Sequence, residues 1–118
     1  MLAAPFRGRA YRKIALGQAW GGRLDRVLLP TPTGRHALWY FLELCRDRLA
    51  PGDEVVVAGY NFYVVVRVLL QWGLKPVFAD VEPGTLCLDP EALAARTTGR
   101  TRMVVVTHMF GHPADNRA

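Results

Sequence analysis

The 118-residue chain contains no serine, and cysteine and lysine each occur only twice. The absence of serine excludes a Ser-His-Asp hydrolase. Cys45 and Cys87 lie far apart in the chain, and neither belongs to a Cys-x-x-Cys motif or to a cysteine and histidine cluster at zinc spacing. We therefore expect two reduced thiols, buried or half-buried, in a reducing compartment.

Long hydrophobic runs are also missing. Arg67 interrupts the longest apolar stretch, between Tyr60 and Trp72, so no segment has the length of a membrane span. The first residues, MLAAPF, place no basic residue before a short apolar patch, which does not fit a secretory signal. We expect a cytoplasmic protein whose 51% hydrophobic content suffices for one modest core.

Acidic residues are scarce in the first quarter of the chain. Up to Arg26 six basic residues accompany one acid, Asp25, whereas the remainder holds nine of each, and the net charge is +5. We interpret residues 1–25 as a basic N-terminal arm, interleaved with Phe6, Tyr11 and Trp20. Such an arm can bind nucleic acid or an anionic membrane as a non-catalytic binding module, or it can be a solvated segment that packs on a partner subunit.

Segments of strand and helix character alternate along the rest of the chain. The apolar patterns predict strands over residues 26–30, 54–58, 75–80 and 102–108, and helices over 34–49, 62–72 and 89–99. Asn61 and Asp89 are the expected N-caps of the second and third helices, and Gly73 is the expected stop of the second. This order predicts an α/β fold with a mostly parallel sheet and right-handed crossovers.

Ligands in such folds bind beyond the carboxyl ends of the strands. One of these ends is TPTGR, residues 31–35, where Thr31, Thr33 and Gly34 precede a helix whose free N–H groups favour a phosphate. Arg35 would add a positive charge. The sequence is neither a Walker A nor a G-x-G-x-x-G motif, so an ordinary turn and helix cap remains the alternative.

Two further strand ends carry aromatic or imidazole side chains. In GYNF, residues 59–62, an aromatic ring can stack on a planar ligand or can belong to the core. In HMFGH, His108 and His112 are four residues apart, a zinc-like spacing only on a helix. Gly111 and Pro113 disfavour a helix there and no third ligand is near, so we expect no metal site.

Three longer phrases share their order and spacing with one known family. They are TGRHAL (33–38), LAPGDEVVVAGYNF (49–62) and the run from GLKPVFADVEPG to HMFGHPAD (73–115). Over about residues 26 to 118 the chain resembles the DegT/DnrJ/StrS family of sugar aminotransferases, which use pyridoxal 5′-phosphate (PLP). The resemblance implies a partial three-layer α/β/α sandwich, the N-terminal part of the large domain of a fold type I PLP-dependent transferase, truncated at residue 118.

The resemblance also implies roles for single residues. Thr33 and Gly34 would form the cradle of the cofactor phosphate, with Arg35 in place of the family's hydroxyl residue. Phe62 would stack on the pyridine ring, with Asn61 where the family has threonine. His108 would lie near the cofactor, whereas His112 replaces a usual glutamine.

Two family residues have no counterpart here. The aspartate that pairs with the pyridine nitrogen and the lysine that anchors PLP would both lie beyond Ala118, and neither Lys13 nor Lys75 matches that lysine. We therefore expect this chain alone neither to attach PLP nor to transaminate, and its unpaired sheet edges to make it marginally stable. In full, the resemblance implies a homodimer that moves an amino group from a donor such as glutamate to a sugar-nucleotide ketone.

Overall fold

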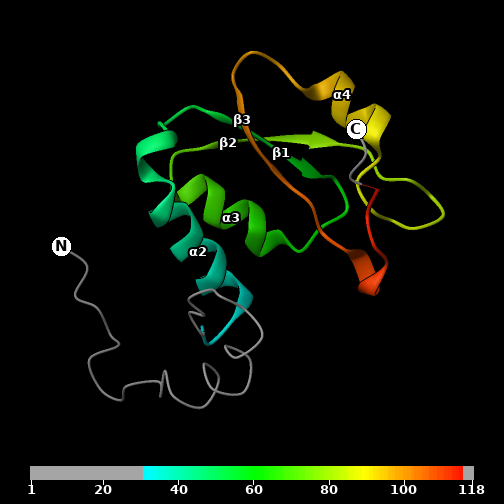
Figure 1. Cartoon of the computed structure of the whole chain (residues 1–118), viewed down its shortest axis with the longest axis horizontal. Coiled ribbons are helices and arrows are strands. Elements are labelled where there is room, and N and C mark those ends of the chain that lie inside the picture. The colour runs from blue at the N-terminus through cyan, green and yellow to red at the C-terminus, as the bar shows by residue number, and fades with distance from the viewer. Residues whose placement is uncertain (1–30, 116–118) are drawn as a thin grey trace, which may run out of the picture. The chain divides into compact units, whose positions relative to one another are not determined.

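A computed structural model of the chain describes residues 31–115 (Figure 1). The chain divides into two units, residues 1–37 and 38–118, and each is considered by itself. The expected basic arm, residues 1–25, and the strand expected at 26–30 lie outside the described residues. No helix within residues 31–115 is long and apolar enough to cross a membrane.

The three strands of the second unit form one parallel sheet in the order β2-β1-β3. Strand β1 (Glu54–Ala58) lies in the centre, β2 (Lys75–Ala79) on one side and β3 (Thr101–Val105) on the other. All five residues of β1 are buried, which confirms the prediction of a strand covered on both faces. The last strand ends at Val105, three residues earlier than the pattern predicted.

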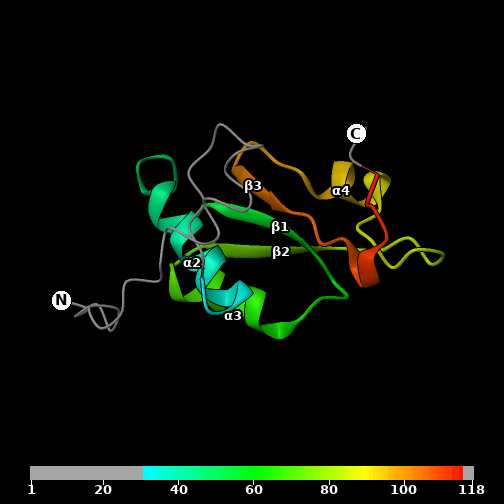
Figure 2. The same ribbon diagram turned by 60° about the horizontal axis from the view of Figure 1, so that its bottom comes forward.

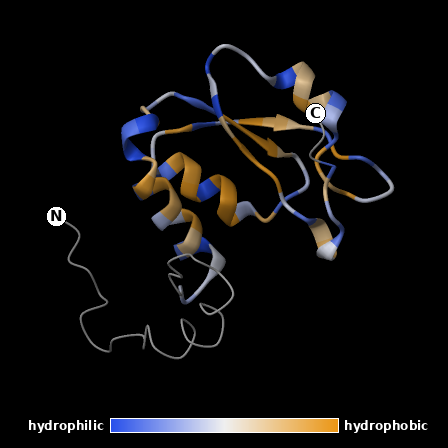
Figure 3. Ribbon diagram, in the orientation of Figure 1, coloured by the Kyte–Doolittle hydropathy of each residue, from blue (hydrophilic) through white to orange (hydrophobic). Residues whose placement is uncertain are grey.

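Helices cover both faces of this sheet (Figure 2). On one face Val55 packs with Leu42 of α2 (Gly34–Leu44) and with Val68 and Leu69 of α3 (Tyr63–Gln71). On the other face the core consists of four residues and is covered by α4 (Pro90–Arg96); these residues are Val56, Ala58, Ala79 and Leu88. In Figure 3 the strands and parts of α2 and α3 carry the hydrophobic colour.

Helix α2 is shorter than its apolar pattern predicted. The α-helix ends at Leu44, and residues Arg46–Arg48 form a 3-10 turn instead of continuing to Leu49. After this turn, Leu49 packs against the core residues that surround Val55. Phe41 is 51% exposed, whereas Trp39 packs against the core with its ring 5.5 Å from that of Trp72.

The ends of α3 and α4 test the predicted caps. Phe62, not Asn61, caps α3, so that prediction was wrong; the Asn61 carboxamide instead binds the Phe62 N–H and a distant threonine. Gly73 ends α3 with a φ of +72°, as expected. Asp89 caps α4 as predicted, since its Oδ1 accepts the Glu91 N–H at 2.9 Å, but α4 ends at Arg96 rather than Gly99.

Candidate functional site

The residues of TPTGR form a turn followed by the start of α2. Thr33 Oγ1 accepts the His36 N–H at 3.4 Å, the arrangement of a helix N-cap. Gly34 and Arg35 are exposed, and the described part of the chain offers their N–H groups no acceptor. A Cβ built on Gly34 meets nothing within 4 Å, and N–H groups at the start of a helix that lack an acceptor can bind an anion.

Within the second unit, the loops that follow β1 and β3 meet at the carboxyl edge of the sheet. The Asn61 Nδ2 donates to Thr107 Oγ1 at 3.0 Å, across 46 residues of sequence. The Oδ1 of the same carboxamide accepts the Phe62 N–H at 2.7 Å. The two bonds use both ends of the amide, so the Asn61 side chain ties the loop that carries Phe62 to the residue that precedes His108.

The ring of Phe62 lies at the surface, not in the core. It is 64% exposed and makes an edge contact with Tyr63 at a centroid distance of 5.0 Å. The ring lies on a loop that the hydrogen bond from Asn61 to Thr107 joins to the loop after β3, and an exposed phenyl ring can stack on a planar ligand. Phe62 therefore does not belong to the core of this unit, and its stacking on a planar ligand stays a prediction.

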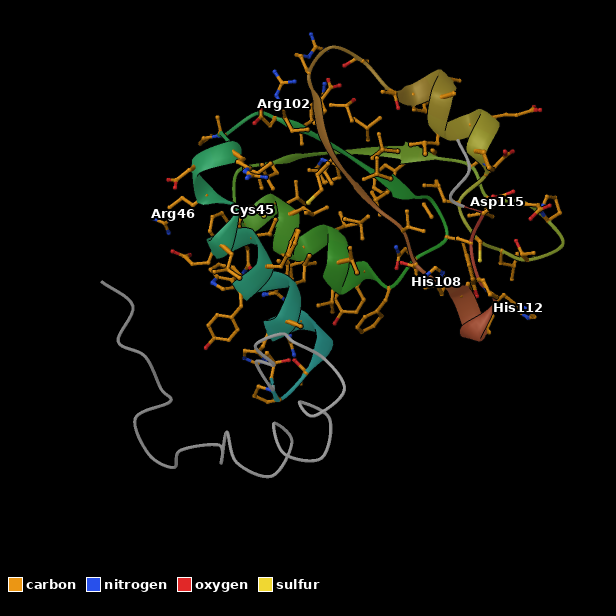
Figure 4. The ribbon with its side chains drawn as sticks, viewed as in Figure 1. Cys45, Arg46, Arg102, His108, His112 and Asp115 are labelled. Atoms are coloured by element: carbon orange, nitrogen blue, oxygen red, sulfur yellow. The ribbon has the colours of Figure 1, made fainter. Side chains whose placement is uncertain are left out.

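The loop after β3 contains no helix that would bring two imidazoles together at zinc spacing. Residues Met109–Gly111 form a 3-10 turn, and Phe110 within it has a φ of +51°. His108 Nδ1 accepts the Ala114 N–H at 3.0 Å, while His112 lies beyond the turn (Figure 4). Among residues 31–115, no group of three or more His, Cys, Asp or Glu side chains is arranged to hold a metal ion.

His108 also borders a hollow between β3 and α4. Its volume is about 250 Å³, and its walls are mostly aliphatic, with Leu88, Leu93, Val104 and Val106 among them. Asp115 is the other titratable residue of the lining. The hollow is therefore an apolar recess whose polar groups come from the loop after β3.

The opposite, amino-terminal edge of the sheet holds a buried carboxylate. Glu54, whose side chain is 3% exposed, binds the Thr98 hydroxyl, the Arg100 guanidinium and the Lys75 ammonium group at 2.7 to 3.1 Å. The hydrogen bond from Thr98, followed by those from Arg100 and Lys75, lowers the Glu54 pKa from 4.5 to about 2 against the opposing effect of burial. Lys75 is thus engaged at the edge away from Phe62 and His108.

Sequence reasoning named Phe62 and His108 but missed the groups that fix them. Thr107 directly precedes His108, and Ala114 lies six residues after it, yet neither residue type signals a role by itself. Their contacts depend on strand order and loop path, which the sequence pattern does not specify. Thr33, Gly34 and Arg35 belong to the other unit, so their relation to Phe62 and His108 stays a prediction.

Comparisons with known proteins show the family and the fold of the chain. Residues 28–118 match the DegT/DnrJ/EryC1/StrS aminotransferase family. An L-glutamine:2-deoxy-scyllo-inosose aminotransferase of Streptomyces lividus is 36% identical over 116 residues, 97% of this chain and 27% of that protein. The chain thus spans about a quarter of the length of this curated relative.

Solved structures of similar proteins share the fold. The crystal structure of 3-amino-5-hydroxybenzoic acid synthase superposes on 70% of this chain and 21% of its own, with a TM-score of 0.64 and 38% identity. NtdA of Bacillus subtilis, crystallised with its cofactor PMP, gives a TM-score of 0.64 at 29% identity over 70% of this chain and 18% of its own. These likenesses confirm the expected partial α/β fold of a fold type I PLP-dependent transferase, and the chain belongs to the DegT/DnrJ/EryC1/StrS aminotransferase family.

Proposed function

We propose that this chain supplies one side of the PLP site of an aminotransferase that transfers an amino group to a keto-sugar, with a nucleotide-linked sugar as the substrate class. The name of the Streptomyces lividus relative favours L-glutamine as donor, and L-glutamate is the alternative donor of the same chemistry. Amino-sugar biosynthesis for a cell-surface polysaccharide or an antibiotic is the corresponding role.

The observation that carries this proposal is the hydrogen bond between Asn61 and Thr107. It joins the loops of two neighbouring parallel strands at the edge where ligands of α/β folds bind. One loop presents the exposed Phe62 ring and the other presents His108. A planar aromatic cofactor needs such a stacking face together with a polar group at its rim.

Each residue has a separate task in the proposed site. The N–H groups of Gly34 and Arg35 bind the cofactor phosphate at the start of α2, and the Arg35 guanidinium adds a charged hydrogen bond. Phe62 stacks on the pyridine ring and excludes water from one face, and His108 contacts the cofactor rim. When bound, PLP supplies the electron sink that transamination requires.

Residues 1–118 do not provide the lysine for this chemistry in our proposal. Lys75 begins β2 at the amino-terminal edge of the sheet, where its Nζ lies 3.1 Å from Glu54 Oε1. Lys13 lies outside the described residues. The proposed contribution of this chain is therefore non-covalent cofactor binding, and formation of a homodimer by the full enzyme stays a prediction.

A titration with PLP, followed by tryptophan fluorescence, tests the proposal. We expect Phe62→Ala to raise the dissociation constant about 2- to 13-fold, because an aromatic stacking contact contributes about 0.5–1.5 kcal/mol. Phe78→Ala is the matched control, since Phe78 is a 51% exposed phenylalanine that belongs to strand β2 and to neither of the two loops that carry Phe62 and His108. Equal affinity of wild type and Phe62→Ala, or an equal loss in Phe78→Ala, would contradict the proposed stacking role.

A further inference from the structure

The segment after β3 folds back on itself through a tight turn. The Gly111 N–H donates to the His108 carbonyl at 3.1 Å, and the His112 N–H donates to the Met109 carbonyl at 2.9 Å. Phe110 and Gly111 both have positive φ angles, 51° and 84°, which reverse the chain. As a result, Ala114 returns to the side chain of His108.

Two buried groups hold this returned segment in place. The thiol of Cys87, 3% exposed, donates to the His112 carbonyl at 3.4 Å, and Ala114 itself is 7% exposed. The segment is thus anchored to the 81–88 loop through Cys87, and Ala114 is buried within the unit. The contact between Ala114 and His108 belongs to a fixed loop conformation.

The chemistry of this contact determines which ring nitrogen of His108 carries the proton. A backbone N–H is always a donor, so the Nδ1 atom 3.0 Å from the Ala114 nitrogen must present a lone pair. In a neutral imidazole the other nitrogen, Nε2, then carries the hydrogen. We propose that the Ala114 amide fixes His108 as the Nε2–H tautomer, so that His108 meets a ligand as a hydrogen-bond donor and not as a base.

In this tautomer, His108 offers the proposed PLP site one hydrogen-bond donor, the Nε2–H group. A fixed Nε2–H recognises an oxygen with a free lone pair, such as a carbonyl, phenolate or carboxylate oxygen, and does not accept a proton while the Nδ1 bond persists. The ligand class rests on the proposed function above, whereas the tautomer rests only on the loop. The two can therefore fail separately.

Long-range proton–nitrogen NMR of the ¹⁵N-labelled chain tests the assignment without cofactor, at mildly alkaline pH where imidazoles are neutral. We expect His108 Nδ1 to show the shift of an unprotonated nitrogen and Nε2 that of a protonated one. His112, whose ring has no hydrogen-bond partner among residues 31–115, is the internal control and should average between tautomers. Averaging at His108, or a protonated Nδ1, would overturn the inference.

Ala114→Pro removes the donating N–H and should return the His108 ring to averaged shifts. If that variant does not fold, the wild-type spectrum alone decides. PLP is then added to the wild type, and the Nε2 proton resonance of His108 should move while Nδ1 stays unprotonated. A fixed Nε2–H tautomer with no response to PLP would support the assignment and contradict the proposed function; a ring that becomes protonated at Nδ1 with PLP would overturn the assignment.

Discussion

Glu54 shows how one buried charge is stabilised by residues distant in sequence. Its carboxylate accepts hydrogen bonds from Thr98, Arg100 and Lys75, so the first residues of β1 and β2 and the turn before β3 converge on one side chain. A buried carboxylate without such donors would be protonated or excluded from the interior. The sequence placed Glu54 in a buried strand but did not reveal its three partners, which only the parallel register brings together.

The lowered pKa of Glu54 predicts acid sensitivity with a definite sign. Because the folded-state pKa is about 2 and the ordinary value is 4.5, the unfolded chain takes up the proton first as pH falls. The free energy of unfolding should therefore be highest above pH 4.5 and decline as pH falls toward 2. Urea unfolding across this range measures the decline.

In Glu54→Gln the free energy of unfolding should decline less steeply as pH falls, because one titrating carboxyl group is gone. The variant should also be less stable than wild type at neutral pH. Glu43→Gln is the control, because the Glu43 side chain is 46% exposed and pairs with Arg46 on the surface of α2. An unchanged pH slope in Glu54→Gln would show that another carboxyl group carries the acid sensitivity.

Helix α3 depends on burial along one face. Leu69 is fully buried, whereas its neighbour Leu70 is 58% exposed. We expect Leu69→Ala to lower the free energy of unfolding by about 2–5 kcal/mol and Leu70→Ala by about 0.5 kcal/mol or less. Chemical denaturation of both variants measures the difference. If Leu69→Ala does not fold, Leu69→Met is measured in its place and should lower the free energy of unfolding by less than about 1.5 kcal/mol. Equal losses for Leu69→Ala and Leu70→Ala would contradict the described core.

The end of α3 requires a glycine. Gly73 has a φ of +72°, and a Cβ there would lie 3.4 Å from the Pro51 Cβ. Gly73→Ala should therefore lower the free energy of unfolding by about 1–2 kcal/mol. Gly84→Ala, in an open turn with nothing within 4 Å, should change it by no more than about 0.5 kcal/mol. Equal denaturation midpoints for the two variants would contradict this account.

Local patterns predicted the type of these elements better than their ends. Alternating strands and helices, the buried β1 run and the Asp89 cap follow from residue type and period alone. The end of α2 and the cap of α3 do not, because tertiary contacts decide them. Leu49 follows a 3-10 turn and packs against the core, and the Asn61 amide donates a hydrogen bond to Thr107 and does not cap α3.

At the scale of the whole chain, the candidate site combines segments that the sequence separates widely. The strand ends identified the loops at the carboxyl edge of the sheet, and the resemblance to the family singled out Phe62 and His108 within them. The bonds that fix them, from Asn61 to Thr107 and from Ala114 to His108, depend on the β2-β1-β3 strand order and on a left-handed turn. Those features arise from long-range packing and are not encoded in a local motif.

The central proposal is that Phe62 and His108 contact the ring of PLP and that Gly34 and Arg35 contact its phosphate. Backbone amide NMR of the ¹⁵N-labelled chain during a PLP titration tests it most directly, with pyridoxal, which lacks the phosphate, as the matched probe. We predict that PLP perturbs Gly34, Arg35, Phe62 and His108, and that pyridoxal perturbs Phe62 and His108 but not Gly34 and Arg35. Perturbation confined to Glu54, Lys75 and Arg100, or none at all, would contradict the account.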